Sequence, residues 1–178
     1  ESAVEFHGQA VAWIAAEDED AAQAAARHMR VKYEPLPATL TLRQAIDANA
    51  FHLPPANVAR GDAEAALARA PHVLDGEVDC GGQDHFYLET QAAWAEPSED
   101  GSLFVNSSTQ HPSEVQQAVA HVLHWPFHQV TVQCPRMGGG FGGKETQAAA
   151  PAILAALAAV KTGKRVRVRY NRDQDMAL

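Results

Sequence analysis

A run of glycines between residues 138 and 143, broken only by Phe141, constrains this chain more than any other feature. An apolar run that favours a strand precedes it, and an alanine-rich run that favours a helix follows it. Glycine tolerates positive φ and lets the backbone approach a bound group closely. The N-terminus of a helix also presents free N–H groups and the positive end of a dipole. The loop therefore predicts a site for a phosphorylated ligand.

Two nucleotide-binding patterns fit this loop in part. The P-loop pattern G-x-x-x-x-G-K-[ST] fits Gly138, Gly143 and Lys144. Glu145, however, stands where a hydroxyl should hold Mg²⁺, and a carboxylate there would repel a triphosphate. The dinucleotide pattern G-x-G-x-x-G also fits, but the acidic residue expected about 20 positions further on is missing, because Asp173 lies too far along. Since glycine-rich loops match either pattern easily, nucleotide binding remains an alternative.

Composition indicates an ordinary globular chain. Hydrophobic residues make up 46% of the 178 residues, and the net charge of −8 argues against nucleic acid as a general partner. No run approaches the ~20 apolar residues that cross a bilayer, and the N-terminus shows no secretory signal. We therefore expect no membrane partner and a cytoplasmic location. Cys80 and Cys134 have no metal-ligand spacing and are expected to be buried free thiols in a reducing compartment.

Local patterns predict helices and strands without strict alternation, which is typical of the α+β class. Pro54-Pro55 and Gly61 indicate a linker over residues 51–62, and the Asp-Gly pair at 100–101 predicts a hairpin turn. Predicted strands cover residues 11–16, 31–34, 73–78, 92–95, 103–106, 130–134 and 165–170. Predicted helices cover residues 17–30, 42–46, 63–70, 113–123 and 148–160.

Two further motifs accompany the glycine loop: GGQDHFYLE at residues 81–89 and STQHPSE at residues 108–114. With RMGGGFGGKE at residues 136–145, they resemble, in order and spacing, the molybdenum hydroxylases, the xanthine dehydrogenase and aldehyde oxidase family. The resemblance covers nearly the whole chain. It implies that residues 1–57 form the end of an α/β hammerhead domain and residues 58–178 the first part of a molybdopterin-binding domain.

The resemblance also implies a molybdenum–molybdopterin cofactor and the residues around it. In this family the pterin holds the metal, so the protein supplies the surrounding contacts. Gln83 matches the residue whose amide donates toward an oxo ligand of molybdenum, and Phe141 and Gly142 match loop residues beside the metal. Gly139 and Gly140 match the backbone that approaches the cofactor. Gln83 and Phe141 are therefore expected next to the metal without ligating it.

Glu145 carries the substrate prediction. It matches a carboxylate that contacts the heterocyclic substrate in purine-oxidising members, where aldehyde oxidases usually have an apolar residue. The resemblance thus implies Gln83 and Glu145 as catalytic residues, with hypoxanthine or xanthine hydroxylated by oxygen from water. Aldehydes or other N-heterocycles remain alternatives. A simpler explanation is that Glu145 occupies the first turn of a helix, where negative charge is favoured.

The resemblance finally implies partners. The family's general base and substrate-binding arginines lie beyond Leu178, so the chain is expected to be a fragment that is inactive by itself. Expected partners are a purine, the rest of the molybdenum domain, and a domain or subunit that carries 2Fe-2S clusters and FAD, in an oligomeric enzyme. An interaction module that keeps the fold but has lost the cofactor remains a further alternative.

Overall fold

A computed structural model describes residues 3–177. The described chain divides into two compact units, which are treated separately below. One unit holds the residues up to Arg27 together with those from Gly82 onward, and the other holds His28–Gly81. Every helix within the described residues is too short or too polar to span a bilayer.

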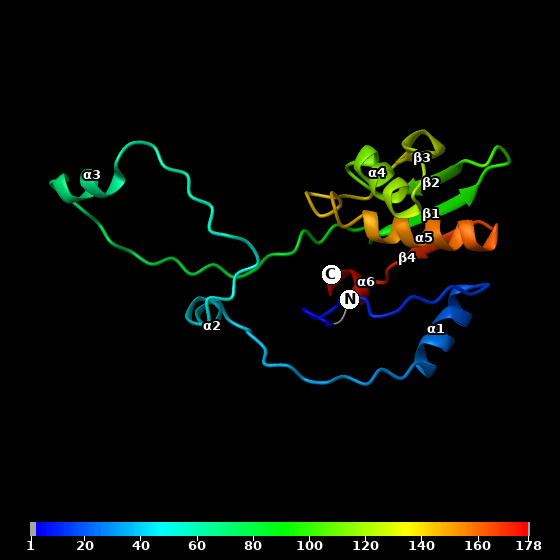
Figure 1. The fold of residues 1–178 in the computed structure, drawn as a ribbon, viewed down its shortest axis with the longest axis horizontal. Coiled ribbons are helices and arrows are strands. Elements are labelled where there is room, and N and C mark those ends of the chain that lie inside the picture. The colour runs from blue at the N-terminus through cyan, green and yellow to red at the C-terminus, as the bar shows by residue number, and fades with distance from the viewer. Residues whose placement is uncertain (1–2, 178) are drawn as a thin grey trace. The chain divides into compact units, whose positions relative to one another are not determined.

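The first unit is built around a four-stranded mixed sheet with the order β3-β2-β1-β4 (Figure 1). Strand β1 pairs antiparallel with both β2 and β4, whereas β2 pairs parallel with β3. The parallel pair is possible because a helix crosses over between its two strands. The strands are β1 (Ala92–Pro97), β2 (Leu103–Ser107), β3 (Val130–Gln133) and β4 (Val166–Arg169).

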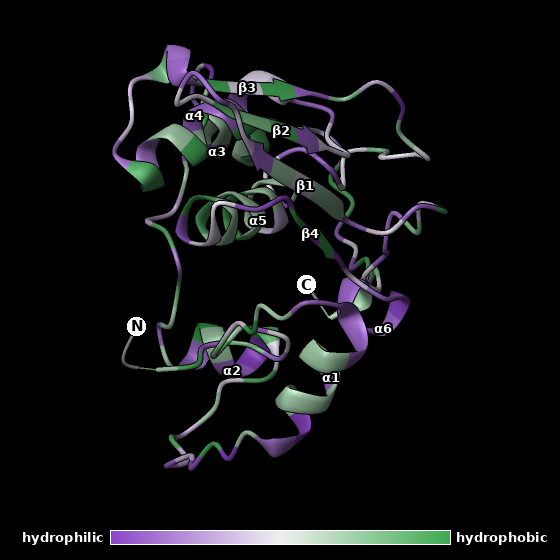
Figure 2. Ribbon diagram, turned by 90° about the vertical axis from the view of Figure 1, so that its right-hand side faces the viewer, coloured by the Kyte–Doolittle hydropathy of each residue, from purple (hydrophilic) through white to green (hydrophobic). Residues whose placement is uncertain are grey.

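Two helices, α4 (Pro112–Leu123) and α5 (Ala149–Thr162), pack on one face of this sheet. Helix α5 lies beside β1 and β4 (Figure 2). Its buried side is made almost entirely of alanine, and such small side chains let the helix backbone approach the sheet closely. Because β1 and β2 alternate buried and half-buried residues, only one face of each strand contributes to this core.

Local signals explain where the two helices begin and end. Pro112 occupies the first turn of α4, where the missing N–H costs nothing. The residue that follows α4 is His124 (φ 55°) and the residue that follows α5 is Gly163 (φ 67°), both in the left-handed conformation that commonly terminates helices. Pro151 is tolerated in α5 because it lies in the first turn.

The remaining elements of this unit are α1 (Glu19–His28), a short 3₁₀ helix η1 (Phe127–Gln129) and α6 (Arg172–Met176). The sequence patterns missed α6. Asn171 and Gln174 form a reciprocal capping box that starts it. The N-terminal segment reaches the sheet unit through Trp13, whose ring stacks on Tyr170 at 6.2 Å between centroids.

The second unit, His28–Gly81, contains two short helices and no buried residue. Helix α2 (Leu42–Asp47) begins with a capping box at Thr41, and α3 (Ala63–Arg69) begins with Asp62 as its N-cap. Both helices were predicted from the sequence, and both are stabilised by capping rather than by packing.

Three predicted strands, at residues 11–16, 31–34 and 73–78, are wrong: none belongs to a sheet in the described chain. A strand needs a neighbour for its N–H and C=O groups, and an apolar run alone does not supply one. The α+β class is confirmed as a mixed helix and sheet unit. The hammerhead assignment and the boundary at residues 57 and 58 stay predictions.

The two cysteines also differ from expectation. Both are free, as predicted, but Cys80 is exposed and Cys134 is half-buried.

Candidate functional site

The glycine loop has a backbone conformation that demands glycine at two positions. Gly139 (φ 97°) and Gly142 (φ 96°) lie in the left-handed region, and a side chain at either would be strained. Phe141 also has positive φ, 53°, which is uncommon for a residue with a side chain. Its ring is 77% exposed. The loop therefore presents backbone, plus one aromatic ring, to its surroundings.

Several N–H groups of this loop are available to a ligand. Those of Gly139, Gly140 and Phe141 make no hydrogen bond within residues 3–177, although Gly140 is buried. The N–H groups of Gly142 and Lys144 instead donate to Oε1 of Gln110, at 2.9 and 3.3 Å. Because backbone donors away from water normally have partners, the open end of the loop suits a ligand rich in oxygen.

The side chain of Gln110 packs directly against the backbone of the glycine loop. A Cβ added at Gly140 would lie 2.5 Å from Oε1 of Gln110, so this close approach needs a glycine. The carbonyl of Lys144 accepts from the N–H of Gln110 at 2.8 Å and from Oγ1 of Thr109 at 3.2 Å. The STQHPSE motif thus holds the end of the glycine loop.

The side chain of Lys144 is fully buried and points away from the open end of the loop. Its Nζ donates to Oε2 of Glu89 at 2.9 Å and to Oγ of Ser108 at 2.8 Å. It also lies 4.7 Å from the centre of the Tyr87 ring. Since a P-loop lysine must reach a phosphate, these contacts argue against the P-loop interpretation.

A second network attaches α6 to the loop. Nε2 of Gln91 donates to the carbonyl of Gly143 at 2.8 Å and to the Tyr87 hydroxyl at 3.0 Å. The buried carboxylate of Asp175 accepts from the N–H of Gln91 at 2.9 Å. Arg172 donates to the carbonyl of Tyr87 at 2.7 Å. The segment before β1 is therefore held by the loop on one side and by α6 on the other.

The predicted site residues Gln83 and Glu145 lie in different surroundings. His85, which was not predicted as a site residue, lies against the loop, since a Cβ at Gly143 would lie 2.9 Å from its Cγ. Gln83 is exposed and makes no hydrogen bond to a described residue. Glu145 is half-buried and also free of hydrogen bonds to residues 3–177. It lies before Ala148, the N-cap of α5, so the simpler explanation that places it in the first turn of the helix is wrong.

Sequence reasoning missed four polar side chains that build the site. Glu89, Gln91 and Gln110 lie within or beside the other two motifs. Lys144 was considered only as a phosphate ligand. What they share in the sequence is that each lies within one of the three motifs or just after one. They are Glu89, Gln91, Gln110 and Lys144.

Comparison with known proteins identifies the family. Residues 47–178 match the family described as the molybdopterin cofactor-binding domain. The chain belongs to this family. It is 45% identical over 98% of its length to a xanthine dehydrogenase of Drosophila pseudoobscura pseudoobscura, and 42% identical over 97% to a nicotinate hydroxylase of Emericella nidulans. The chain spans 13% of the length of each of these curated relatives.

A solved structure agrees with this assignment. The aldehyde oxidoreductase of Desulfovibrio gigas matches 91% of the chain with a TM-score of 0.76 and 27% sequence identity, over 19% of its own chain. The resemblance drawn from the three motifs is thus confirmed for the family, as are the prediction of a molybdenum oxidoreductase family and that of a molybdopterin cofactor.

The loop of this molybdopterin-binding chain fits such a cofactor. The cofactor carries a phosphate and further oxygen atoms, and Gly139, Gly140 and Phe141 offer unpaired N–H donors. The glycines leave no side chain in the way, and Lys144 is already neutralised by Glu89. Residues 3–177 contain no group of three His, Cys, Asp or Glu side chains that could hold a metal ion directly.

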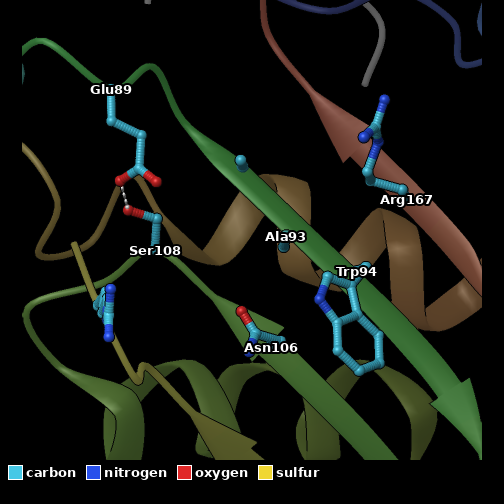
Figure 3. Close-up of a pocket in the computed structure, with 8 residues that line it drawn as sticks. Glu89, Ala93, Trp94, Asn106, Ser108 and Arg167 are labelled. Atoms are coloured by element: carbon cyan, nitrogen blue, oxygen red, sulfur yellow. Dashed lines mark hydrogen bonds between the residues drawn. The ribbon is translucent and has the colours of Figure 1, made fainter. Parts of the chain in front are cut away.

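A small pocket lies near the glycine loop, but none of the predicted site residues lines it. The pocket opens on the face of the sheet that α4 and α5 leave uncovered. Trp94 projects to this face, opposite to the neighbouring core residue Ala93 (Figure 3). Figure 3 shows Glu89 at one end, hydrogen-bonded to Ser108. The further lining residues include Asn106, Arg136 and Arg167. Gln83, Glu145 and the open end of the loop are not among the residues that line this pocket.

Glu89 is held in its charged form. Partial burial by itself would raise the pKa of Glu89. Hydrogen bonds from Ser108, from the N–H of Gly138 and from Lys144, together with the lysine charge, outweigh burial and lower the pKa below its ordinary value. The charged carboxylate is therefore part of the folded loop.

Acid should destabilise the chain through Glu89. Because its pKa is lower in the folded than in the unfolded state, its contribution is present above the ordinary value of 4.5 and is lost as the pH falls below that value. In the variant Glu89→Gln, we expect a weaker loss of thermal stability between about pH 5 and about pH 3. Thermal unfolding followed by circular dichroism measures this. Equal pH dependence in both proteins would show that the acid sensitivity arises elsewhere.

Proposed function

We propose that this chain supplies the cofactor loop of a molybdenum hydroxylase of the xanthine dehydrogenase type, which oxidises hypoxanthine and xanthine. The observation that carries the proposal is the position of Glu145. Its carboxylate follows the loop directly, is half-buried, and has no hydrogen bond to a described residue and no place in a helix. The 45% identity to a xanthine dehydrogenase supports the same choice of substrate.

In this proposal the glycine loop and the other predicted site residues have different roles. The backbone of Gly139, Gly140 and Gly142 would hold the cofactor, and the ring of Phe141 would lie beside the metal. The amide of Gln83 would donate a hydrogen bond toward an oxygen ligand of the metal, and an amide keeps this donor at every working pH. When bound, the molybdenum centre supplies hydroxylation of a ring carbon with oxygen from water.

Glu145 binds and orients the purine. A carboxylate accepts hydrogen bonds from ring N–H groups, and it can donate one when it is protonated. This interaction selects a purine over an aldehyde, because an aldehyde offers no ring N–H. Gln83 and Glu145 are thus the catalytic residues of the proposal.

The remaining machinery belongs to the intact enzyme. We place the general base in the rest of the molybdenum domain, and the 2Fe-2S clusters and FAD on another domain or subunit. In this proposal residues 1–57 form the end of a hammerhead domain and residues 58–178 the start of the molybdopterin-binding domain, in an oligomeric cytoplasmic enzyme. The chain by itself is then inactive, which agrees with its 13% share of its relatives' length.

The proposal is tested in the intact enzyme that contains this chain. Mass spectrometry should find about one molybdenum atom per chain. Glu145→Val should then lower kcat/KM for hypoxanthine by about 10- to 100-fold, because a charge-assisted hydrogen bond is lost. Glu145→Gln, which keeps an acceptor and a donor, should lose less.

Two outcomes would contradict the proposal at different levels. Folded enzyme without molybdenum would exclude the hydroxylase. Molybdenum-loaded enzyme whose purine turnover is unchanged by Glu145→Val would favour an aldehyde or another N-heterocycle as substrate.

A further inference from the structure

The three sequence motifs meet at one buried side chain, that of Lys144. Its Nζ is bonded to Glu89 at the end of the first motif and to Ser108 at the start of the second, at 2.9 and 2.8 Å. The lysine itself lies in the third motif. These partners are 55 and 36 residues away along the chain. A single ammonium group therefore joins three segments that are distant in sequence.

Burial of this ammonium group costs free energy of folding, so its presence inside the fold needs an explanation. The Lys144 side chain is fully buried, and a charge away from water destabilises a fold unless it is paired and hydrogen-bonded. Apolar side chains of similar size often fill such positions at no loss of stability. The lysine is therefore better explained by what it holds in place than by the stability it adds.

The backbone of Lys144 is fixed by the same segment as its side chain. Its N–H donates to Oε1 of Gln110, and its C=O accepts from the N–H of Gln110 at 2.8 Å. The same Oε1 accepts from the N–H of Gly142 at 2.9 Å. Because Ser108 lies two residues before Gln110, the bond from Nζ to Ser108 also fixes the segment that places Gln110 against the loop.

We infer that Lys144 is a positioning residue: its buried ammonium group anchors the glycine loop to the other two motifs and so fixes Gly142 beside the cofactor and Glu145 beside the substrate. The identity of that substrate and cofactor rests on the proposed function, whereas the anchoring rests on the contacts of Lys144 alone. Glu145 follows Lys144 directly, so the start of its side chain is placed by a residue that is held at both backbone groups and at its tip.

The anchoring is tested by amide hydrogen exchange in the intact enzyme that contains this chain. In Lys144→Met, the amides at positions 142 and 144 should exchange about tenfold faster, because Gln110 loses its fixed position. The amides of β1 and β2 should keep their exchange rates, which separates a loosened loop from general unfolding. Lys144→Arg keeps a buried cation and should show a smaller increase. Lys161→Met, at an exposed lysine near the end of α5, is the matched control and should change nothing.

A second variant keeps the test decisive if Lys144→Met does not fold. Glu89→Gln retains size and hydrogen-bonding atoms but removes the charge that pairs with Lys144, and it should increase loop exchange in the same direction. Loop exchange that is unchanged in every folded variant of this pair would overturn the inference.

The effect on Glu145 is tested by a double-mutant cycle in the intact enzyme. Lys144→Met should lower kcat/KM for hypoxanthine by about tenfold, and should lower it much less when Glu145→Val is already present. An equal loss in both backgrounds would overturn the role in placing Glu145. Absence of molybdenum would instead overturn the proposed function, while faster loop exchange in Lys144→Met would still support the anchoring.

Discussion

Replacement of Leu103 by alanine is expected to lower the free energy of unfolding of this chain by about 3 kcal/mol. Among residues 3–177, Leu103 is the largest fully buried apolar side chain, and it lies at the start of β2 opposite Val130 of β3. Helix α5 presents mainly alanine to this core. Such short side chains cannot move into the space that Leu103→Ala would leave, so the cavity should persist. Urea denaturation followed by circular dichroism measures the change.

Leu88→Ala is the matched control for this prediction. Leu88 is 91% exposed and lies in the same unit, four residues before β1. Its replacement should change the free energy of unfolding by no more than about 0.5 kcal/mol. Similar losses in the two variants would show that the core beneath β2 is not formed as described.

The elements around the glycine loop were predictable because local and tertiary signals agree there. The Asp-Gly pair at 100–101 sets the turn between β1 and β2, and alternation in both strands matches their burial. Pro112 starts α4, and the alanine-rich run forms α5. Each signal lies within the element that it predicts, so no distant contact was needed to interpret it.

The failed predictions concern elements that depend on a partner. Apolar runs at residues 11–16, 31–34 and 73–78 read as strands, but strand formation depends on a neighbouring backbone, which the described residues do not provide. Helix α6 was missed for the opposite reason: it is short and polar, and only the pair Asn171 and Gln174 indicates its start.

The candidate site was predictable only in part. Motif resemblance singled out Gln83, Glu145 and the loop, whose roles stay predictions. The buried environment of Lys144 was not predictable, because a lysine after two glycines equally suggests a phosphate ligand. Only the positions of Glu89 and Ser108 in space reveal that the lysine points inward.

Replacement of Gly143 by alanine is expected to damage the loop by overpacking it against a buried aromatic ring. A Cβ at Gly143 would lie 2.6 Å from Cε1 of Tyr87 and 2.9 Å from Cγ of His85. His85 is exposed and can move, but Tyr87 is only 7% exposed and its hydroxyl is bonded to Gln91 at 3.0 Å. The tyrosine must shift or the loop must open. We expect a loss of about 2 kcal/mol in the free energy of unfolding, typical of overpacking.

Two further glycine variants separate steric crowding from backbone strain. Gly142 has φ 96°, and its added Cβ would be no closer than 3.6 Å to His85, so Gly142→Ala tests strain without a clash. Gly82 has open space around it, so Gly82→Ala should be nearly neutral. If Gly143→Ala is as well tolerated as Gly82→Ala in urea denaturation, then Tyr87 does not support the loop. Packing of Tyr87 against Gly143 would then not contribute to the candidate cofactor site, and the loop would depend on its hydrogen bonds to Glu89, Gln91 and Gln110 and on the contacts of Lys144.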